Sequence, residues 1–386
     1  MASSINASTA GVGGIITTAD SSGNLNIQSG GSTVVAVTAT GATVTGTLAA
    51  TGAVTLTGSL NTPNTFGFKN RIINGGMNTD QRNAAASQTF TAAGALAYSV
   101  DRWYGYCTGA NVTGQQIAGG TTPTVTQNRY RFTGAASVTA VGFGQRIEQK
   151  NSYDLAGSTC TLSADLGISA TLTTVTWTAY YATTTADTFG SLASPTVTSI
   201  ATGTFTVGAT VANFSANISI PAAATTGIQI LFTVGALTAG LTWTIGNVQL
   251  EKGSTATSFD FREYSTELAM CQRYLPAIRS SSINNGTGFT GAIASATLGY
   301  IVCPLAVKTR VPATGIVSST NLYYSDGVAI AGIATSQVLS TAAAVPNTSV
   351  DALGVTIGIT GATAGRSLLI SLNAATDYIY FTGCEL

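Results

Sequence analysis

Aromatic side chains gather at three places in this sequence, and they are the groups that could contact a ligand most directly. The clusters are Trp103-Tyr104-Tyr106, Trp177-Tyr180-Tyr181 and Tyr323-Tyr324. An aromatic ring can stack on the C–H face of a pyranose, while phenol hydroxyls and nearby amides hydrogen-bond the sugar hydroxyls. This chemistry makes a carbohydrate the first ligand to consider. The candidate ligand-binding residues are Trp103, Tyr104, Tyr180, Tyr323 and Tyr324.

Packing in a hydrophobic core is the alternative for each of these aromatic residues. Side chains alternate between the two faces of a strand, so Trp177 and Tyr181 share one face and Tyr180 takes the other. At least one of the three should therefore point outward unless a partner covers it. We expect Trp177 and Trp243 in the core, whereas exposure and burial are equally open for the candidate tyrosines elsewhere in the chain.

Two pairs of charged residues stand close together in the sequence and offer a second kind of site. Asp101 precedes Arg102, and Arg146 lies two residues before Glu148. These side chains could build a ligand site, or they could form partly buried ion pairs that fix the edges of a sandwich. In a chain with only 8% charged residues, we favour the structural pairing.

Residue types that usually carry catalysis or bind metals are scarce. The sequence contains no histidine, which removes the usual general base and the commonest metal ligand. Its five cysteines are far apart and form no Cys-x-x-Cys pair, so we expect buried free thiols. No spacing marks paired carboxylates for glycoside cleavage or a calcium loop. We therefore predict no catalytic residues, no metal, no cofactor and no enzymatic activity. The cysteines are Cys107, Cys160, Cys271, Cys303 and Cys384.

The composition predicts an all-β chain that is too long for one compact domain. Of 386 residues, 45% are hydrophobic, 44 are glycine and 8 are proline. Thr, Val, Ser and Gly favour strands and tight turns, and good helix formers are sparse. The net charge is zero and no Lys/Arg cluster occurs, which argues against a nucleic-acid partner. The most apolar window, 228–243, is interrupted by Thr and Gly, so no membrane insertion is expected.

Residues 1–66 form a segment of distinct composition, in which Asp20 is the only charged residue. It contains a weak repeat, because residues 41–48 (GATVTGTL) are echoed by residues 52–60 (GAVTLTGSL). Each unit is one short strand with a glycine turn, too small to bury its own apolar side. We expect intertwined strands of several chains in an oligomeric stalk. A flexible linker rich in Gly, Ser and Thr is the alternative.

The rest of the chain divides into two β-rich regions around one short helix. Residues 67–264 contain short alternating segments with turn signals between them, which is the pattern of a jelly-roll β-sandwich. Residues 277–386 return to strands and are long enough for a second, distal antiparallel sandwich. The fold class is therefore all-β: an N-terminal stalk segment followed by two jelly-roll-like sandwiches.

The connector helix is expected over residues 265–276. Ser265 can act as its N-cap, Glu267 lies where the helix dipole favours a negative charge, and Pro276 ends the element. Its apolar face would be formed by Leu268, Cys271 and Leu275. We expect this helix to pack between the two sandwiches.

Several short runs of uncommon residues occur in order along the chain. They are RIINGGM at 71–77, DQR at 80–82, VDRW at 100–103, GQRIE at 144–148, NVQLEKG at 247–253, TSFDFR at 257–262, ELAMCQRY at 267–274 and GCEL at 383–386. Together they resemble a module that is common in bacteriophage tail fibres. Residues 4–7 and 18–25 resemble the N-termini of phage tail proteins. The resemblance covers nearly the whole chain.

The resemblance implies a virion fibre or receptor-binding protein that forms a homotrimer and carries a carbohydrate-binding-like jelly roll. Residues 1–66 would attach it to other virion proteins of the tail, neck or baseplate, and the outer part would bind a glycan or protein on the host surface. The expected location is the virion, and no signal peptide is evident. Two alternatives stay open: a structural fibre without a receptor, and a polysaccharide-degrading spike. The spike is disfavoured because no β-helix repeat with paired carboxylates is apparent.

Overall fold

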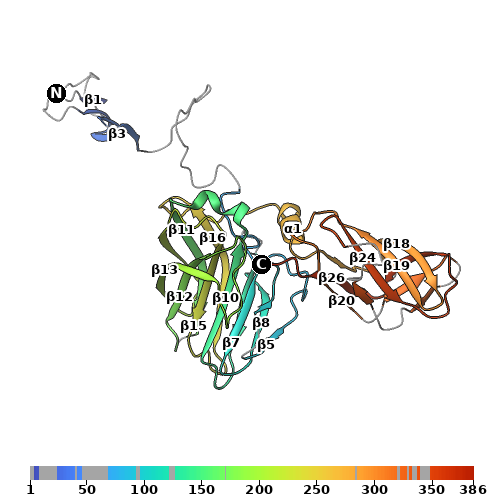
Figure 1. The fold of residues 1–386 in the computed structure, drawn as a ribbon. Coiled ribbons are helices and arrows are strands. Elements are labelled where there is room, and N and C mark those ends of the chain that lie inside the picture. The colour runs from blue at the N-terminus through green and yellow to red at the C-terminus, as the bar shows by residue number, and fades with distance from the viewer. Residues whose placement is uncertain are drawn as a thin grey trace. The chain divides into compact units, whose positions relative to one another are not determined.

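The computed structural model contains two compact units, Met1–Thr62 and Pro63–Leu386 (Figure 1). Strands dominate both units, and the described part of the chain contains a single α-helix, which confirms the all-β prediction. No helix among the described residues is long and apolar enough to cross a membrane. The described residues are 4–7, 24–39, 41–45, 68–92, 96–120, 127–169, 171–282, 285–319, 322–327, 330–332, 337–339 and 348–386.

The first unit contains a small four-stranded sheet with strand order β1-β2-β3-β4. β1 pairs with β2 in parallel, and the other pairs are antiparallel. The turn from β2 to β3 uses Gly30 and Gly31, whose φ angles of 59° and 79° lie in the left-handed region that glycine adopts without strain. The strands are β1 (Ser4–Ala7), β2 (Leu25–Ser29), β3 (Ser32–Thr38) and β4 (Gly41–Val44).

One face of this small sheet is apolar and uncovered. Leu25 lies opposite Val37, and Ile27 lies opposite Val35, which in turn lies opposite Val44. Directly opposed residues point to the same face, so these side chains form one surface, which we call the apolar sheet face. None of residues 24–39 and 41–45 is buried. The second copy of the sequence repeat lies outside the described residues, so the intertwined stalk stays a prediction.

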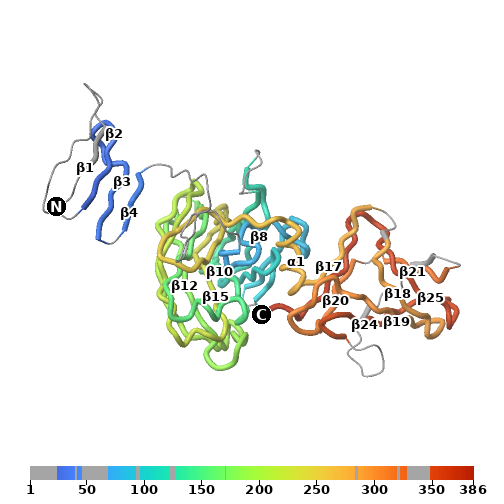
Figure 2. Tube along the Cα trace, turned by 90° about the horizontal axis from the view of Figure 1, so that it is seen from above, coloured from blue at the N-terminus to red at the C-terminus, as the bar shows by residue number. Residues whose placement is uncertain are grey.

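The first sandwich, residues 88–252, consists of two six-stranded antiparallel sheets. One sheet has the order β13-β12-β15-β10-β7-β6 and the other has the order β14-β11-β16-β9-β8-β5. Figures 1 and 2 show β10, β12 and β15 side by side in the first of these sheets. The strands of the first sheet are β6 (Ala97–Tyr98), β7 (Tyr104–Thr108), β10 (Ala140–Ile147), β12 (Thr174–Ala182), β13 (Val197–Thr206) and β15 (Ile228–Val234). Those of the second are β5 (Gln88–Phe90), β8 (Val112–Ala118), β9 (Asn128–Thr133), β11 (Thr159–Ile168), β14 (Ala212–Ser219) and β16 (Thr242–Lys252).

Aromatic rings from both sheets fill the core between them. Trp103 stacks on Phe143 at 4.9 Å between ring centroids, and Phe132 stacks on Trp243 at 5.4 Å. Trp177 and Trp243 are buried, as the sequence predicted. Stacked and edge-on pairs of this kind add to the burial of apolar area. All five cysteines are free and buried, which confirms that prediction too.

The helix α1 (Tyr264–Gln272) begins one residue earlier than expected and has a different N-cap. Its cap is Glu263, which has extended backbone angles and whose carboxylate accepts a hydrogen bond from the main-chain N–H of Ser265. The predicted cap, Ser265, instead lies inside the first turn, so that prediction was wrong. The sequence offered two acceptors two positions apart, and only the backbone conformation decides which one caps the helix. Glu267 does lie in the first turn, and Cys271 is buried.

The second sandwich, residues 277–382, pairs a three-stranded sheet with a seven-stranded sheet. Its core consists mainly of Ile, Leu and Val from alternating strand positions, together with two buried cysteines. The end of the chain returns to the place where the two sandwiches meet (Figures 1 and 2). The smaller sheet contains β17 (Ala277–Arg279), β26 (Tyr378–Thr382) and β20 (Gly315–Ser318). The larger contains β22 (Ile330–Gly332), β21 (Leu322–Ser325), β25 (Ser367–Leu372), β18 (Asn285–Ser295), β19 (Leu298–Pro304), β24 (Ala352–Gly358) and β23 (Gln337–Leu339).

Candidate functional site

Three tyrosines lie on the outer face of the β13-β12-β15-β10-β7-β6 sheet. On β7, Cys107 points into the core, so Tyr104 and Tyr106 point to the outside. On β12, Trp177 points into the core and Tyr180 points out. This alternation brings two residues of one sequence cluster and one of another onto the same surface. We call Tyr104, Tyr106 and Tyr180 the tyrosine face.

Two glycines of β10 allow the rings to lie against the sheet. Gly142 is directly opposite Tyr106 and Gly144 is directly opposite Tyr104. A Cβ atom at Gly142 would lie 2.1 Å from the Tyr106 ring, and one at Gly144 would lie 2.5 Å from the Tyr104 hydroxyl oxygen. Any other residue at these positions would push the rings away from the sheet. The two glycines of β10 therefore allow the tyrosine rings to lie close to the sheet.

Tyr104 points toward this face, but neighbouring side chains cover it. Only 1% of its surface is exposed, because Tyr98 packs edge-on against it at 6.3 Å and the Arg146 guanidinium lies 5.3 Å from its ring centroid. Burial raises the pKa of Tyr104, so its hydroxyl stays protonated at neutral pH and can donate a hydrogen bond. The expectation that the Tyr104 ring stacks on a ligand was wrong, because its own neighbours cover it.

Tyr106 and Tyr180 are half-buried, so part of each ring is accessible. Burial and the neighbouring Tyr180 raise the pKa of Tyr106, which keeps its hydroxyl neutral. Two adjacent phenols can offer both an apolar surface and hydrogen-bonding groups to a ligand.

Amide and hydroxyl groups surround the tyrosines. Gln229 lies opposite Tyr180 in the sheet, and its side-chain oxygen accepts a hydrogen bond of 2.9 Å from Nε of Arg146. That bond directs the Gln229 amide, while Arg146 is held by the main-chain oxygens of Gly190 and Leu386. Thr178 and Thr202 continue the same face, with 3.1 Å between their hydroxyl oxygens. Apart from Arg146 the face is uncharged, which suits a neutral polar ligand.

Two of the predicted site residues belong to hydrophobic cores instead. Trp103 is fully buried, and its indole N–H donates to the main-chain oxygen of Asn74 at 3.0 Å. Tyr324 is 4% exposed, and its hydroxyl donates to the main-chain oxygen of Thr360 at 2.9 Å. Trp103 directly precedes β7, and Tyr324 occupies an inward position of β21. Both side chains are buried, so neither can stack on a ligand. Tyr323 is half-buried on β21 of the second sandwich and does not join the tyrosine face.

Sequence reasoning missed Tyr106 and Gln229 as members of this surface. Tyr106 was detectable, since it lies two residues after Tyr104 and must share its face of the strand. Gln229 was not, because its position beside Tyr180 depends on the pairing of β12 with β15.

The charged residues singled out in the sequence are structural, but they pair with different partners than expected. Glu148 forms an ion pair with Arg273 at 2.8 Å and accepts a 2.9 Å hydrogen bond from the Tyr274 hydroxyl. Arg102 donates to the main-chain oxygen of Arg146 and lies 3.5 Å from the Tyr274 ring centroid. The expected Asp101–Arg102 and Arg146–Glu148 pairs do not form. Both arginines are engaged with α1 or with main-chain oxygens instead.

A buried asparagine organises the start of the first sandwich. Asn74 has a φ of 56°, and its side-chain amide donates to the main-chain oxygens of Thr79 and Asp101 while its oxygen accepts from the Thr79 N–H. The main-chain N–H of Asn74 donates to the carboxylate of Glu267 in α1. These bonds join the RIINGGM and VDRW runs to the helix. Three of the runs, RIINGGM, VDRW and ELAMCQRY, thus meet in one buried polar cluster.

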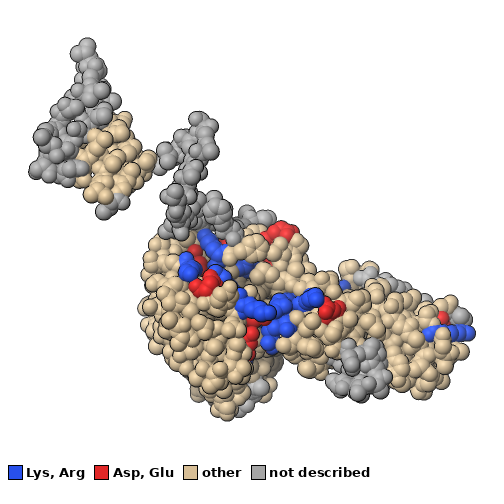
Figure 3. Space-filling view, turned by 45° about the horizontal axis from the view of Figure 1, so that its top comes forward, with Lys and Arg blue, Asp and Glu red and all other residues tan. Residues whose placement is uncertain are grey.

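A second set of contacts joins the two sandwiches. Arg82 forms an ion pair with Glu385 at 2.8 Å. Arg279 donates to the main-chain oxygens of Gln81 and Arg82 at 2.6 and 2.8 Å, and Arg310 donates to that of Glu385 at 2.8 Å. Figure 3 shows the charged surface gathered toward this junction, with large uncharged areas elsewhere.

Asp101 has an unusual pKa but no access to a substrate. It accepts hydrogen bonds of 2.9 and 2.5 Å from the main-chain and side-chain nitrogens of Gln81, and none of its surface is exposed. Burial raises the pKa of Asp101 to about 7. A carboxyl with this pKa could act as a general acid in an open cleft, but here the fold encloses it.

Replacing Asp101 by asparagine should change how stability depends on pH. The folded protein retains a proton on Asp101 that the unfolded chain, with its ordinary pKa of 3.8, releases between about pH 4 and pH 7. The free energy of unfolding of the wild type should therefore fall as pH rises through this window, by at most about 1.4 kcal/mol per pH unit. Urea denaturation across this range should give a flatter profile for D101N. Parallel profiles would contradict the assignment.

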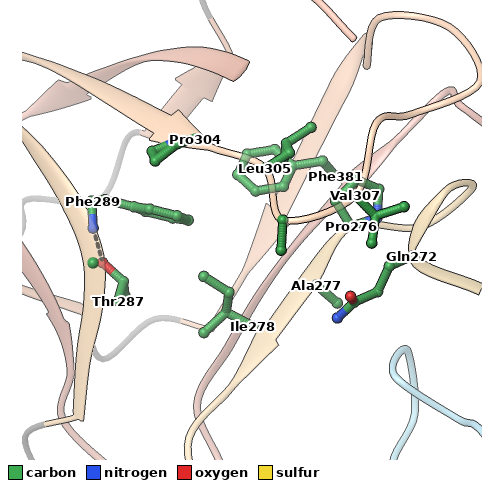
Figure 4. Close-up of a pocket in the computed structure, with 12 residues that line it drawn as sticks. Gln272, Pro276, Ala277, Ile278, Thr287, Phe289, Pro304, Leu305, Val307 and Phe381 are labelled. Atoms are coloured by element: carbon green, nitrogen blue, oxygen red, sulfur yellow. Dashed lines mark hydrogen bonds between the residues drawn. The ribbon is translucent and has the colours of Figure 1, made fainter. Parts of the chain in front are cut away.

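A separate apolar pocket of about 250 Å³ lies at the end of the second sandwich nearest α1 (Figure 4). Its polar side chains are those of Gln272 and Thr287, and the Thr287 hydroxyl already donates to the main-chain oxygen of Ile370 at 2.9 Å. The remaining walls are apolar, including Ile278, Leu305 and Phe381. Few groups could orient the hydroxyls of a sugar, so this pocket is not a carbohydrate site.

No protein-family model and no curated protein matches this chain. Among solved structures, the enzymatically active domain of tailspike protein 4 of bacteriophage CBA120 is 16% identical over 48% of this chain and 22% of that one, with a TM-score of 0.31. The CBM22-2 xylan-binding domain from Paenibacillus barcinonensis is 12% identical over 39% and 92% of the two chains, with a TM-score of 0.26. A CBM4 structure is 15% identical over 47% and 98%, with a TM-score of 0.25. These similarities are distant, and they assign neither a family nor a function.

Proposed function

We propose that this chain is a virion fibre protein of a bacteriophage that binds a neutral glycan of the host-cell surface through the tyrosine face. The observation that supports binding is the placement of Tyr106 and Tyr180 on one sheet surface with accessible ring area, where burial keeps the hydroxyl of Tyr106 neutral. Gln229 lies directly opposite Tyr180, and Tyr104 lies two residues from Tyr106 on the same face of β7. A pyranose presents an apolar face and a rim of hydroxyls, and this surface matches both.

The same surface argues for weak binding at a single site. The tyrosine face belongs to an outer sheet surface, so a bound sugar would stay partly in water and would gain only part of the free energy of stacking and hydrogen bonding. A homotrimer would present three such faces together and raise the overall affinity through effective concentration. Oligomeric display is therefore part of the proposed mechanism.

Removing both accessible rings should weaken attachment to host cells. The Y106A/Y180A variant loses stacking area and two hydroxyls, and we expect its affinity for host cells to fall by at least about tenfold, equivalent to about 1.4 kcal/mol. The readout is competition, in which purified protein is added to cells before intact phage and residual adsorption is counted. Y153A is the matched control, because Tyr153 is 59% exposed in the same sandwich and lies outside the tyrosine face.

The outcomes separate the proposal from its alternatives. Wild-type protein should block adsorption, Y153A should block it equally, and Y106A/Y180A should not. Equal blocking by all three would reject the tyrosine face as the site. No blocking by correctly assembled wild type would favour a structural fibre, and release of reducing sugar from the host polysaccharide would favour a spike enzyme.

The first unit is proposed to assemble the fibre and to attach it to other virion proteins. Its apolar sheet face has no cover among the described residues, and a small sheet with such a face is not stable alone in water. No charged residue lies between residues 24 and 45, so copies can associate without charge repulsion. Subunits of a homotrimer would supply the cover.

Removing residues 1–62 should therefore produce a monomer that keeps both sandwiches folded. The second unit has its own cores and compact contacts, so its circular dichroism and unfolding transition should be retained. Light scattering should report a trimer for the full chain and a monomer for the truncated one, and the truncated chain should not enter virions. A truncated chain that stays trimeric or is still incorporated would contradict this division of roles.

A further inference from the structure

A pocket lined by aromatic side chains lies apart from the tyrosine face. It has a volume of about 120 Å³ and is enclosed by residues 74–78, by Gln127 before β9, and by residues 259–267 at the start of α1. It shares no lining residue with the tyrosine face.

Its rim carries exposed aromatic rings. Phe261 is 44% exposed and Tyr264 is 55% exposed. Outside the lining residues, Phe68 is 63% exposed, and its ring centroid lies 5.9 Å from the Arg262 guanidinium. Phe259 is half-buried and lines the wall, and a Cβ atom at Gly76 would lie 3.5 Å from its ring. Large apolar side chains exposed together usually mark a surface that binds something.

The floor of the pocket is rigid and electrically neutral. Arg262 and Glu267 form an ion pair at 3.1 Å, and Nη1 of Arg262 also donates to the main-chain oxygen of Ile72 at 3.0 Å. Nε of Arg262 is buried and has no hydrogen-bond partner in the described part of the chain, although nine-tenths of this residue is enclosed. A buried donor without a partner is costly, so a water acceptor at this point would be stabilising.

Polar groups that could form further hydrogen bonds lie at the edge of the pocket. The side-chain oxygen of Asn78 accepts from the Asn128 amide at 3.1 Å, which leaves the Asn78 amide nitrogen as a donor. The Gln127 side chain is exposed, and the Tyr264 hydroxyl makes no hydrogen bond to any residue that the structure describes. Amide donors and acceptors beside aromatic rings, over a neutral floor, match a neutral polyhydroxylated ring and do not match an ionic ligand.

We infer that this pocket is a second carbohydrate site, which takes one neutral sugar ring at the end or branch of a glycan. The faces of Phe261 and Tyr264 stack on the ring, and the Asn78 and Gln127 amides bond its hydroxyls. The small volume admits part of a single ring, so the rest of the glycan stays outside. This site does not depend on binding at the tyrosine face.

The test is saturation-transfer NMR on the full chain, with methyl β-D-glucopyranoside, methyl β-D-galactopyranoside, N-acetyl-D-glucosamine and L-rhamnose as separate probes. The variants are F261A/Y264A for the pocket, Y106A/Y180A for the tyrosine face and Y153A as an exposed-tyrosine control. The substituted side chains of F261A/Y264A and Y153A are exposed, and an unchanged unfolding transition verifies the fold of each variant. We expect at least one probe whose transfer persists in Y106A/Y180A and Y153A. For that probe, the Kd obtained by titrating the transfer signal should rise about tenfold or more in F261A/Y264A, equivalent to about 1.4 kcal/mol.

Each other outcome overturns the inference. Transfer that is unchanged in F261A/Y264A, or lost only in Y106A/Y180A, removes the pocket and leaves the tyrosine face standing. Absence of transfer from all four probes to the wild type also rejects the pocket as a sugar site. A changed oligomeric state of F261A/Y264A without sugar transfer would assign the aromatic rim to a protein contact.

Discussion

Replacing Glu267 by alanine is expected to lower the free energy of unfolding of the Pro63–Leu386 unit by about 3–5 kcal/mol. The Glu267 carboxylate is the acidic partner of Arg262 and also accepts a hydrogen bond from the main-chain N–H of Asn74. All three residues are buried. Truncation would leave a guanidinium without its counter-charge and an N–H without an acceptor, and both are costly away from water.

Urea denaturation followed by circular dichroism measures this loss. E263A is the matched control, because Glu263 is an exposed carboxylate at the start of the same helix and bonds only within the first turn. E263A should lose clearly less stability than E267A. Surface ion pairs contribute at most about 1 kcal/mol. If E267A lost less stability than that, other groups would have to compensate the Arg262 charge, and the prediction would be wrong.

Replacing Arg82 by alanine is expected to cost a similar amount, about 3–5 kcal/mol, and to loosen the junction of the two sandwiches. Arg82 is the ion-pair partner of Glu385 at 2.8 Å, and its guanidinium lies 5.5 Å from the Tyr98 ring centroid and 5.6 Å from that of Tyr380. Burial already raises the pKa of Glu385 despite the opposing charge of Arg82. Without that charge the carboxylate would be buried and uncompensated, so its pKa should rise further.

The protonation of Glu385 predicts the sign of a pH effect in R82A. At neutral pH the uncompensated charge opposes folding, whereas in acid, below the raised pKa of Glu385, the group takes up a proton and much of the cost disappears. The stability difference between wild type and R82A should therefore shrink as pH falls. Denaturation at both pH values and limited proteolysis between the sandwiches would report it, and a difference independent of pH would show that lost packing, not charge, causes the effect.

K308A is the matched control for R82A. Lys308 and Asp351 form an ion pair of the same length, 2.8 Å, but their side chains are 72% and 55% exposed. Water screens such a pair, so its loss should cost at most about 1 kcal/mol. The contrast between two ion pairs of equal geometry would isolate the contribution of burial.

Both predictions concern residues in the runs that resemble the tail-fibre module. The side chains of these runs make structural contacts between parts of the fold. Asn74, Glu148 and Arg273 join the start of the first sandwich, β10 and α1, and Glu385 joins the second sandwich to the first. Tyr106 and Tyr180, the residues proposed to contact a ligand, lie outside the runs. The resembling runs therefore mark contacts that hold the two sandwiches and α1 together. They do not include the residues of the proposed ligand-binding surface.

The sequence by itself determined the features that depend on local periodicity and composition. The abundance of β-branched and small residues predicted strands, and the two-residue alternation placed Trp177 inside and Tyr180 outside correctly. The sparse, scattered cysteines predicted buried thiols. The helix was also detectable, because good helix formers and an acidic first turn gather only there. These signals need no knowledge of which strands pair.

The tertiary structure alone decided which outward residues stay accessible and which charges meet. Tyr104 points outward like Tyr106, but Tyr98 and Arg146 cover its ring, and only strand pairing brings them there. Glu148 pairs with Arg273, which is 125 residues away, and not with the neighbouring Arg146. Side-chain alternation is a property of one strand, whereas cover and ion pairing depend on register between distant strands. Period-two patterns therefore predict the direction of a side chain, and long-range packing decides its exposure.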